Sequence, residues 1–350
     1  MDRRGLLALG IAGLLVGISA FAQKADRPYR VAYLAGSLIS PSEPATPGGY
    51  FDAVTRQLGS HGIVAGRNLE TRFFYRRNDL RDQRDNEWKK EVIAEALSWQ
   101  PDAIVVVGAE VVRVLKGFRT NVPVVFGLVQ DPVSEGLVMN LGRPEANITG
   151  AGIDYYSLAI KRLELAREMV PSLKRVLIVH DRRGGPLPAG PMREFRRVAR
   201  GMNVEVSDVD ITEIDGGLCS AGAHARNATA DVILPMGNIG PPLDDRGGKS
   251  WVEGYGDCLY EMQKRSGIPV IDDSSDTVGQ GVVAAIGEES FESFRRAANV
   301  LARILKGAKP ADVPVDMQMR VQIVLNAKSA REIRLELPAV LRLRADRVIE

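Results

Sequence analysis

Short apolar runs alternate with amphipathic helical stretches along the first half of the chain. Four runs rich in β-branched residues are predicted to be strands, at residues 30–35, 69–75, 103–107 and 122–126. Between them, apolar side chains recur at helical spacing in residues 48–61, 85–99 and 110–118. Strands that alternate with helices in this way are typical of βαβ units, whose strands form a parallel sheet.

The same order of elements returns in the second half. We predict strands at residues 175–180, 203–209, 231–234 and 269–271, and helices at residues 191–202 and 214–226. Residues 100–105 resemble residues 229–234 in pattern, and residues 121–125 resemble residues 267–271. Between these matches the second half is longer and rich in Gly, Pro and Asp, which predicts an enlarged loop at residues 238–256. Two similar α/β lobes, each with its own doubly wound parallel sheet, account for the repeat.

Length and charge agree with a two-domain globular protein. The chain has 350 residues, more than the roughly 250–300 at which a single hydrophobic core stops growing. It contains 46 basic and 44 acidic side chains. This near balance gives no electrostatic footprint for nucleic acid or an anionic membrane, so neither is expected as a partner.

The N-terminus has the three parts of a secretory signal peptide. Arg3 and Arg4 give a cationic start, an uncharged run follows at residues 5–21, and residues 20–22 read Ala-Phe-Ala, a small-x-small cleavage site. A membrane anchor is the alternative, but a span needs about 20 apolar residues and this run is shorter and broken by glycines. We therefore expect cleavage after Ala22 and export to the periplasm. The two arginines leave the choice between the general and the twin-arginine export route open.

The chain has two cysteines, Cys219 and Cys258. In an oxidising compartment they can form a disulfide, and the alternative is two buried free thiols. No Cys-x-x-Cys and no Cys/His spacing typical of a zinc site is present. We expect no metal and no cofactor.

The candidate ligand residues follow the predicted strands. In open α/β sheets, ligands bind beyond the carboxyl ends of the strands, and clefts between domains are favoured pockets. The polar residues at these positions are Ser37, Glu110, Asp131, His180, Asp181, Asn238, Asp272 and Asp273. The set is acidic, which suits recognition of an ammonium group or a polyol.

Helix capping is the alternative role for several of these carboxylates. Asp131 precedes Pro132, the arrangement of an N-cap followed by a proline at the first helical position. Glu110 falls in a first helical turn, where the helix dipole favours an acid. Asp272 and Asp273 precede two serines, and for them capping and ligand contact are equally supported.

The sequence gives little support to an enzyme. The histidines are His61, His180 and His224, and no nucleophile elbow, phosphate loop, dinucleotide fingerprint or zinc-protease motif occurs. His180 followed by Asp181 could imitate acid–base chemistry, but a histidine that ends a strand is more often structural or a ligand contact. We predict a protein that binds and does not catalyse.

One segment carries a family resemblance. Residues 124–126 (VVF), 131–138 (DPVSEGLV) and 141–150 (LGRPEANITG) resemble a signature of the ABC-transporter substrate-binding family related to tryptophan-type amino-acid binding proteins. Further similar segments are residues 58–59, 66–69, 161–165, 304–315 and 344–350. Together these segments are spread over nearly the whole chain beyond the signal peptide.

The resemblance implies a type I periplasmic-binding fold, in which two lobes joined by a hinge close on a ligand. It implies three crossings between the lobes, at residues 149–154, 284–288 and 318–325. Lobe 1 would comprise residues 23–150 and 289–325, lobe 2 residues 151–288, and residues 326–350 a C-terminal helical tail. The implied role is to capture a small molecule, amino-acid-like or another small polar or aromatic solute, and deliver it to an ABC permease. A monomer is expected, and a periplasmic sensor subunit that signals to a membrane receptor is the alternative role.

Three departures from the family pattern fall at predicted ligand loops. Members often have a small hydroxyl residue where this chain has Ala109 and Glu110, and Asn-Pro where it has His180, Asp181 and Arg182. The enlarged loop at residues 238–256 is the third. The sequence therefore predicts a cargo that differs from an aromatic amino acid.

Overall fold

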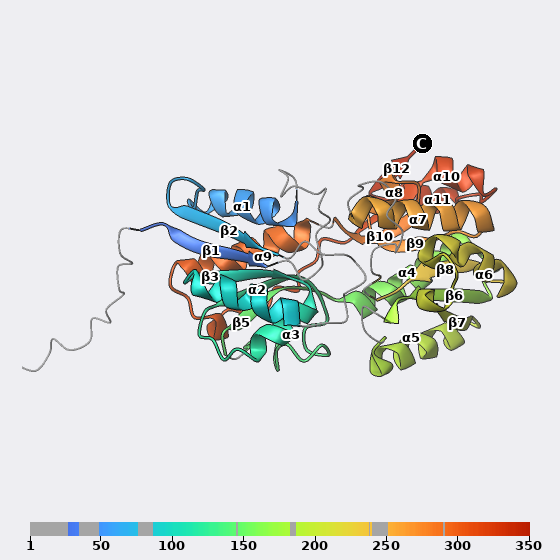
Figure 1. Ribbon diagram of the computed structural model, residues 1–350. Coiled ribbons are helices and arrows are strands. Elements are labelled where there is room, and N and C mark those ends of the chain that lie inside the picture. The colour runs from blue at the N-terminus through green and yellow to red at the C-terminus, as the bar shows by residue number, and fades with distance from the viewer. Residues whose placement is uncertain are drawn as a thin grey trace, which may run out of the picture.

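The protein has two α/β lobes, the first built on one β-sheet and the second on two sheets joined edge to edge (Figure 1). The computed structural model describes residues 27–34, 49–75, 87–144, 146–182, 187–237, 239, 251–289 and 291–350. The expected signal peptide, Ser37 and Asn238 lie outside these residues. Among the described residues, no helix combines the length and the apolar character that a bilayer span requires.

Lobe 1 is a five-stranded parallel sheet covered by helices on both faces. Its order is β2 (Leu69–Phe74), β1 (Tyr29–Leu34), β3 (Ala103–Val107), β4 (Val124–Gln130) and β5 (Ile148–Ile153). Alternate residues of β1 point to opposite faces, because the side-chain period of a strand is two. Val31 packs under α1 (Tyr50–Ser60) and α9 (Glu292–Leu305). Ala32 packs under α2 (Glu87–Ser98) and α3 (Ala109–Lys116). These strands, together with the described parts of the helices, confirm the elements predicted for the first half.

Lobe 2 has two sheets joined edge to edge. One has the order β7 (Glu205–Asp210), β6 (Arg175–His180) and β8 (Val232–Pro235). The other has the order β12 (Arg347–Ile349), β11 (Gln322–Asn326), β10 (Ala284–Glu288) and β9 (Ile271–Ser274). A parallel bridge between Ile233 and Val270 connects β8 to β9. All strand pairs are parallel except that of β10 with β11.

The helices of lobe 2 also cover both faces. One face carries α4 (Tyr155–Met169), α5 (Ala189–Gly201), α10 (Ala327–Glu332) and α11 (Ala339–Arg344). The other carries α6 (Ala221–Asn227) and α7 (Trp251–Ser266), and α8 (Asp276–Gly279) follows β9. On β6, Ile178 packs in the first of these cores and Leu177 in the second. The predicted architecture of two doubly wound lobes is confirmed.

Several predicted segments differ from the structure. The strand predicted at residues 269–271 is observed at Ile271–Ser274, so Asp272 and Asp273 lie within it and do not follow it. The enlarged loop expected at residues 238–256 is wrong from residue 251 onward, because α7 begins at Trp251. Its glycines, Gly254 and Gly256, lie inside the helix, and Gly256 has no room for a side chain against Gln280. The C-terminal tail contains β12 as well as the expected helices. Residues 322–325, expected at the end of lobe 1, belong to β11 (Gln322–Asn326) in a sheet of lobe 2.

The chain crosses between the lobes three times. β5 belongs to the first sheet and α4 packs on the second, so the chain leaves lobe 1 near Asp154. It returns after β10, since α9 packs against α1 and β5. It crosses again between η5 (Pro310–Asp312), which contacts β5, and β11. Because β5 leads toward lobe 2 and β10 leads toward lobe 1, the carboxyl ends of the parallel strands in each lobe point to the other lobe.

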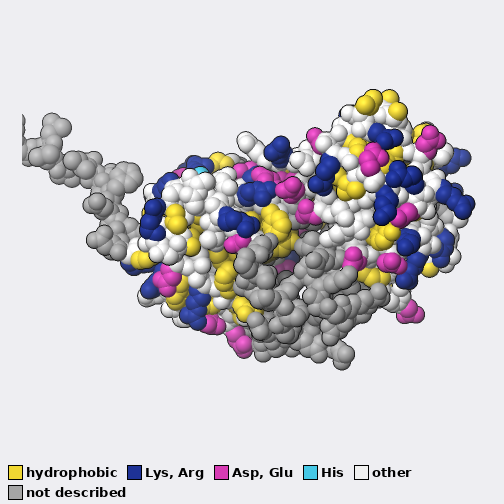
Figure 2. All heavy atoms as spheres, turned by 90° about the horizontal axis from the view of Figure 1, so that it is seen from above, with side chains coloured by type: hydrophobic (Ala, Val, Ile, Leu, Met, Phe, Trp, Pro, Cys, Tyr) yellow, Lys and Arg dark blue, Asp and Glu magenta, His cyan; other side chains and the backbone are white. Residues whose placement is uncertain are grey.

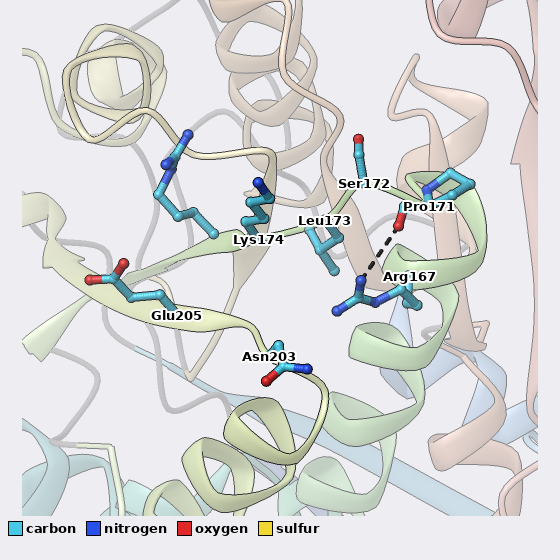
Figure 3. A pocket seen from close by; sticks show the side chains of 8 residues that line it. Arg167, Pro171, Ser172, Leu173, Lys174, Asn203 and Glu205 are labelled. Carbon is cyan, nitrogen blue, oxygen red and sulfur yellow. Dashed lines mark hydrogen bonds between the residues drawn. The ribbon is translucent and has the colours of Figure 1, made fainter.

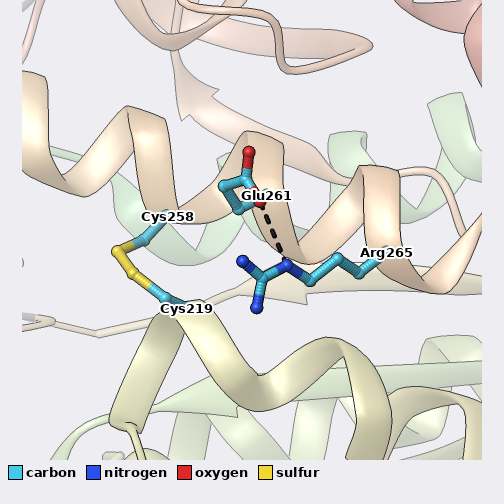
Figure 4. The surroundings of a disulfide bond; sticks show 4 residues. All are labelled: Cys219, Cys258, Glu261 and Arg265. Atoms are coloured by element: carbon cyan, nitrogen blue, oxygen red, sulfur yellow. Dashed lines mark hydrogen bonds and ion pairs between the residues drawn. A yellow bond between two sulfur atoms is a disulfide. The ribbon is translucent and has the colours of Figure 1, made fainter.

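A disulfide joins Cys219 and Cys258 (Figure 4). Cys219 lies in η4 (Gly217–Ser220) and Cys258 in α7, so the bond fastens two elements that cover the same face of lobe 2. Both cysteines are buried in the apolar core there. Of the two alternatives that the sequence left open, the structure has the disulfide.

Candidate ligand-binding site

The carboxyl edge of lobe 2 brings together two of the predicted ligand residues, Asp272 and Asp273, near the end of β9. Asp272 is fully buried. Tyr255 Oη on α7 donates to its Oδ1 at 3.0 Å, and Thr277 Oγ1 on α8 donates to its Oδ2 at 2.9 Å. Asp273, the next residue, is half-buried. Asp272 is therefore held rigidly inside the lobe, and Asp273 is the more accessible carboxylate.

Sequence reasoning missed two residues beneath this edge, Arg162 and Tyr155 on α4. Arg162 is fully buried, and its Nη1 donates to the carbonyl of Pro235 at the end of β8, at 2.5 Å. Its guanidinium carbon lies 5.2 Å from the centre of the Tyr155 ring. Tyr155 Oη accepts the N–H of Gly237 at 2.7 Å. The two side chains thus fix the loop that follows β8.

Negative charge exceeds positive charge around Asp272 and Asp273. Burial, and then the charge of Asp273, raise the pKa of Asp272 from 3.8 to about 7, although Arg162, Thr277 and Tyr255 oppose the rise. Burial also raises the pKa of Tyr255 well above its usual value, so its hydroxyl remains a donor to Asp272. Arg162 supplies one positive charge against two carboxylates. A ligand cation placed beside Asp273 would relieve the repulsion between them.

Gly287 on β10 sets the position of Asp273. A Cβ at Gly287 would lie 1.5 Å from the carbonyl oxygen of Asp273, so β9 and β10 would have to separate to admit it. We expect Gly287→Ala to lower the free energy of unfolding by about 3 kcal/mol, as overpacking of a close backbone contact does. Urea unfolding measures this loss.

The matched control is Gly59→Ala in α1, where a Cβ would meet nothing within 4 Å. There the substitution is expected to be neutral or to stabilise by up to about 1 kcal/mol, because alanine is the better helix former. Equal stabilities for the two variants would contradict this role of Gly287.

His180 and Asp181 lie at the same edge, at the end of β6. His180 Nε2 lies 3.6 Å from Asp208 Oδ2 on β7, and Asp208 is also bonded by Arg196. His180 Nδ1 is buried without a hydrogen-bond partner among the described residues. Asp181 is buried. These contacts describe a histidine held by the neighbouring strand.

In lobe 1 the structure gives Glu110 and Asp131 partners of their own. Lys89 is buried on α2, and its Nζ donates to Glu110 Oε2 at 2.7 Å, so Glu110 compensates a buried charge. Ser134 donates to Asp131 through its N–H at 3.3 Å and its hydroxyl at 2.5 Å. Asp131 therefore has the capping contacts that the sequence suggested, although residues 132–136 form a turn and not the expected helix.

Asp131 also lies near the start of lobe 2. Burial, and then the charges of Glu135 and Asp131, raise the pKa of Tyr156, the second residue of α4. This links the turn after β4 electrostatically to the first crossing. Asp131 thus influences the start of α4 while it also stabilises its own turn.

A surface hollow of about 470 Å³ lies at the opposite end of lobe 2 (Figure 3). It is lined by Arg167, Pro171, Ser172, Leu173, Lys174, Arg175, Asn203 and Glu205. These residues surround the amino-terminal ends of β6 and β7, whereas Asp272 and Asp273 lie at the carboxyl end of β9. Elsewhere, positive and negative side chains are interspersed over both lobes on the face in Figure 2, in keeping with the near-neutral charge of the chain.

The chain has two α/β lobes joined by three crossings, and the carboxyl ends of the parallel strands of each lobe point to the other lobe. This is the type I periplasmic-binding fold. The chain belongs to the ABC transporter substrate binding protein family, whose profile matches residues 81–349. Both the family and the fold predicted from the sequence are confirmed.

Individual relatives are distant in sequence. The chain is 20% identical to the tyrosine-binding protein of Clostridioides difficile strain R20291 over 280 residues, which are 79% of this chain and 74% of that protein. A conserved domain protein from Vibrio cholerae has a TM-score of 0.74 at 20% identity, covering 92% of this chain and 100% of that one. An ABC domain in complex with L-Trp from Streptococcus pneumoniae has a TM-score of 0.72 at 18% identity, with the same coverage.

Proposed function

We propose that the protein binds a small solute between its lobes and delivers it to an ABC permease. The observation that carries the proposal is the orientation of the strands. The carboxyl ends of the parallel strands in both lobes point to the space between the lobes. Closure of two lobes excludes water from a ligand, and the closed form offers a permease a surface that the open form lacks.

The ligand that fits best carries an ammonium group. Asp273 offers a half-buried carboxylate, and buried Asp272 directly beside it is disfavoured in its charged form unless a cation approaches. An amino acid or a related amine supplies that cation. Tyrosine and L-Trp, named for two relatives, belong to this chemical class. The differences at Glu110, His180 and Asp181 support a side chain other than theirs.

The location proposed for this activity is the periplasm. The supporting observation is the sequence of residues 1–22, which has a cationic start, an apolar run and an Ala-Phe-Ala site. Catalysis is no part of the proposal, because the role follows from binding and closure alone.

Native mass spectrometry of protein purified without denaturation should detect a bound small molecule, and calorimetry then measures its affinity. We expect Asp273→Asn to raise the dissociation constant about 10- to 150-fold, because one charged hydrogen bond is worth about 1.5–3 kcal/mol.

The control for this binding experiment is Glu205→Gln, which removes an exposed carboxylate at the far end of lobe 2 and should leave the affinity unchanged. If Asp273→Asn binds like the parent, the ammonium assignment is wrong. Conversion of the ligand to a product by the parent would overturn a purely binding role.

A further inference from the structure

The three crossings converge on one side chain. Gly152 lies near the end of β5 and begins the first crossing, Glu288 ends β10 and begins the second, and Asp316 lies at the start of the third. Arg296, in the first half of α9, contacts all three. α9 is part of lobe 1, so the contact is made from one lobe onto every segment that leads to the other.

The four hydrogen bonds of Arg296 are shared among the three crossings, with two of them going to the third. Nη2 donates to the carbonyl of Gly152 at 3.1 Å and to Oε1 of Glu288 at 2.7 Å. Nη1 donates to the carbonyl of Asp316 at 2.8 Å and to its Oδ1 at 3.3 Å. A guanidinium suits this task because its donors lie in a fixed plane and reach several acceptors at once.

The first and third crossings are also bonded to each other beside Arg296. The N–H of Gly152 donates to the carbonyl of Asp316 at 2.9 Å, and the N–H of Asp316 donates to the carbonyl of Gly150 at 2.9 Å. A Cβ at Gly152 would lie 2.5 Å from the sulfur of Met317, so the strands lie close there. The second crossing is attached to this pair through the carboxylate of Glu288.

The contact between Arg296 and Glu288 excludes solvent. The two side chains are 6% and 4% exposed, so the ion pair cannot exchange its partners for water without the crossings moving apart. Burial raises the pKa of Glu288, and Arg296 is the largest opposing influence. A buried pair of this kind tolerates the loss of one partner poorly, since the other charge is left unpaired.

We propose that Arg296 is the positioning residue of the hinge, which ties the three crossings together so that they bend as one unit. While Arg296 keeps its bonds to the three crossings, the lobes rotate about a common point. The residues at the carboxyl ends of the strands in the two lobes then return to the same relative position. Without these bonds, the second crossing loses its attachment to Arg296 and the first and third keep only their backbone bonds to each other, so the lobes sample a wider range of orientations. Closure of the lobes on a ligand then has a larger entropic cost, because more orientations are lost.

Hydrogen exchange of the ligand-free, full-length protein tests this coupling. In Arg296→Met, we expect the amides of all three crossings, at residues 149–154, 284–289 and 313–322, to exchange at least about tenfold faster, while β3 and β6, the middle strands of their sheets, keep their protection. Glu288→Gln retains the bonds of Arg296 to Gly152 and Asp316. It should therefore accelerate the second crossing more than the other two.

Arg295→Met is the matched control. Arg295 is the preceding residue of α9, and it bonds Glu292 at 2.6 Å and Glu289 at 3.0 Å. Glu289 is the last residue of the second crossing, and Glu292 is the first residue of α9. Arg295→Met should leave the hydrogen-exchange rates of the first and third crossings unchanged.

Faster exchange in only one crossing of Arg296→Met, or an equal rise throughout both lobes, would overturn the proposal. If Arg296→Met does not fold, Arg296→Lys carries the same test. A single ammonium keeps the charge but cannot reach three segments, so all three crossings should again exchange faster together. An Arg296→Lys variant that exchanges like the parent would refute the proposed role of Arg296.

Discussion

Replacing both Cys219 and Cys258 with alanine is expected to lower the free energy of unfolding by about 4 kcal/mol. The disulfide closes a loop with a sequence separation of 39, and constraining an unfolded chain over that length is worth about this much in the chain-entropy description. Alanine suits the test because both cysteines are buried in an apolar core, where a serine hydroxyl would add a cost of its own. Urea unfolding under non-reducing conditions measures the change.

The same experiment in a reducing agent provides the control for the loss of the cross-link. The parent should then fall to nearly the stability of the double variant, because reduction also removes the bond. If parent and variant unfold at the same urea concentration without reductant, the disulfide does not stabilise the fold as described.

Asp272→Asn is expected to make the protein more stable at pH 8 and to flatten its pH dependence. Burial and the charge of Asp273 raise the pKa of Asp272 from 3.8 to about 7. In the parent, the folded state therefore holds this proton more tightly than the unfolded state does. That contribution to stability is fully present below about pH 4 and is lost as the pH rises through about 7. Each tenfold change in proton affinity is worth about 1.4 kcal/mol, so the loss is at most on the order of 4 kcal/mol.

An asparagine can replace the protonated acid because its neighbours can adapt. Thr277 Oγ1 also lies 2.9 Å from the carbonyl of Ser274, to which it can donate while accepting from the new amide. The parent and Asp272→Asn should have similar stabilities near pH 4 and differ increasingly up to pH 8. Thermal unfolding across this range measures the difference, with Asp312→Asn, an exposed aspartate of η5, as the control. A difference that is the same at pH 4 and pH 8 would contradict the account.

The fold could be predicted because strands buried on both faces have nearly continuous apolar sequences. Residues 103–107 (AIVVV) and 175–180 (RVLIVH) form β3 and β6 as expected. α7 was missed because its neighbourhood is rich in Gly, Pro and Asp, and because tertiary contacts override the low helix propensity of Gly254 and Gly256. The short strand β12 has three residues and forms by pairing with β11, so local sequence carries little sign of it.

The site could be predicted in position but less well in its chemistry. The rule that ligands bind beyond strand ends selected Asp272 and Asp273, which the structure has as the second and third residues of β9; their contact with a ligand stays a prediction. The rule could not show that Lys89, distant in sequence, neutralises Glu110. A signal for Arg162 was available, because it occupies a helical position between Ala159 and Ala166, on the apolar face of α4. A charge on an otherwise apolar face indicates a buried partner.

The most direct test of binding between the lobes is a crystal structure of the protein with the ligand that native mass spectrometry identifies. We predict that the ligand lies between the carboxyl edges of the two sheets, with its ammonium group within hydrogen-bond distance of the Asp273 carboxylate. A ligand that instead occupies the hollow beside Arg167 and Glu205, at the far end of lobe 2, would contradict the account.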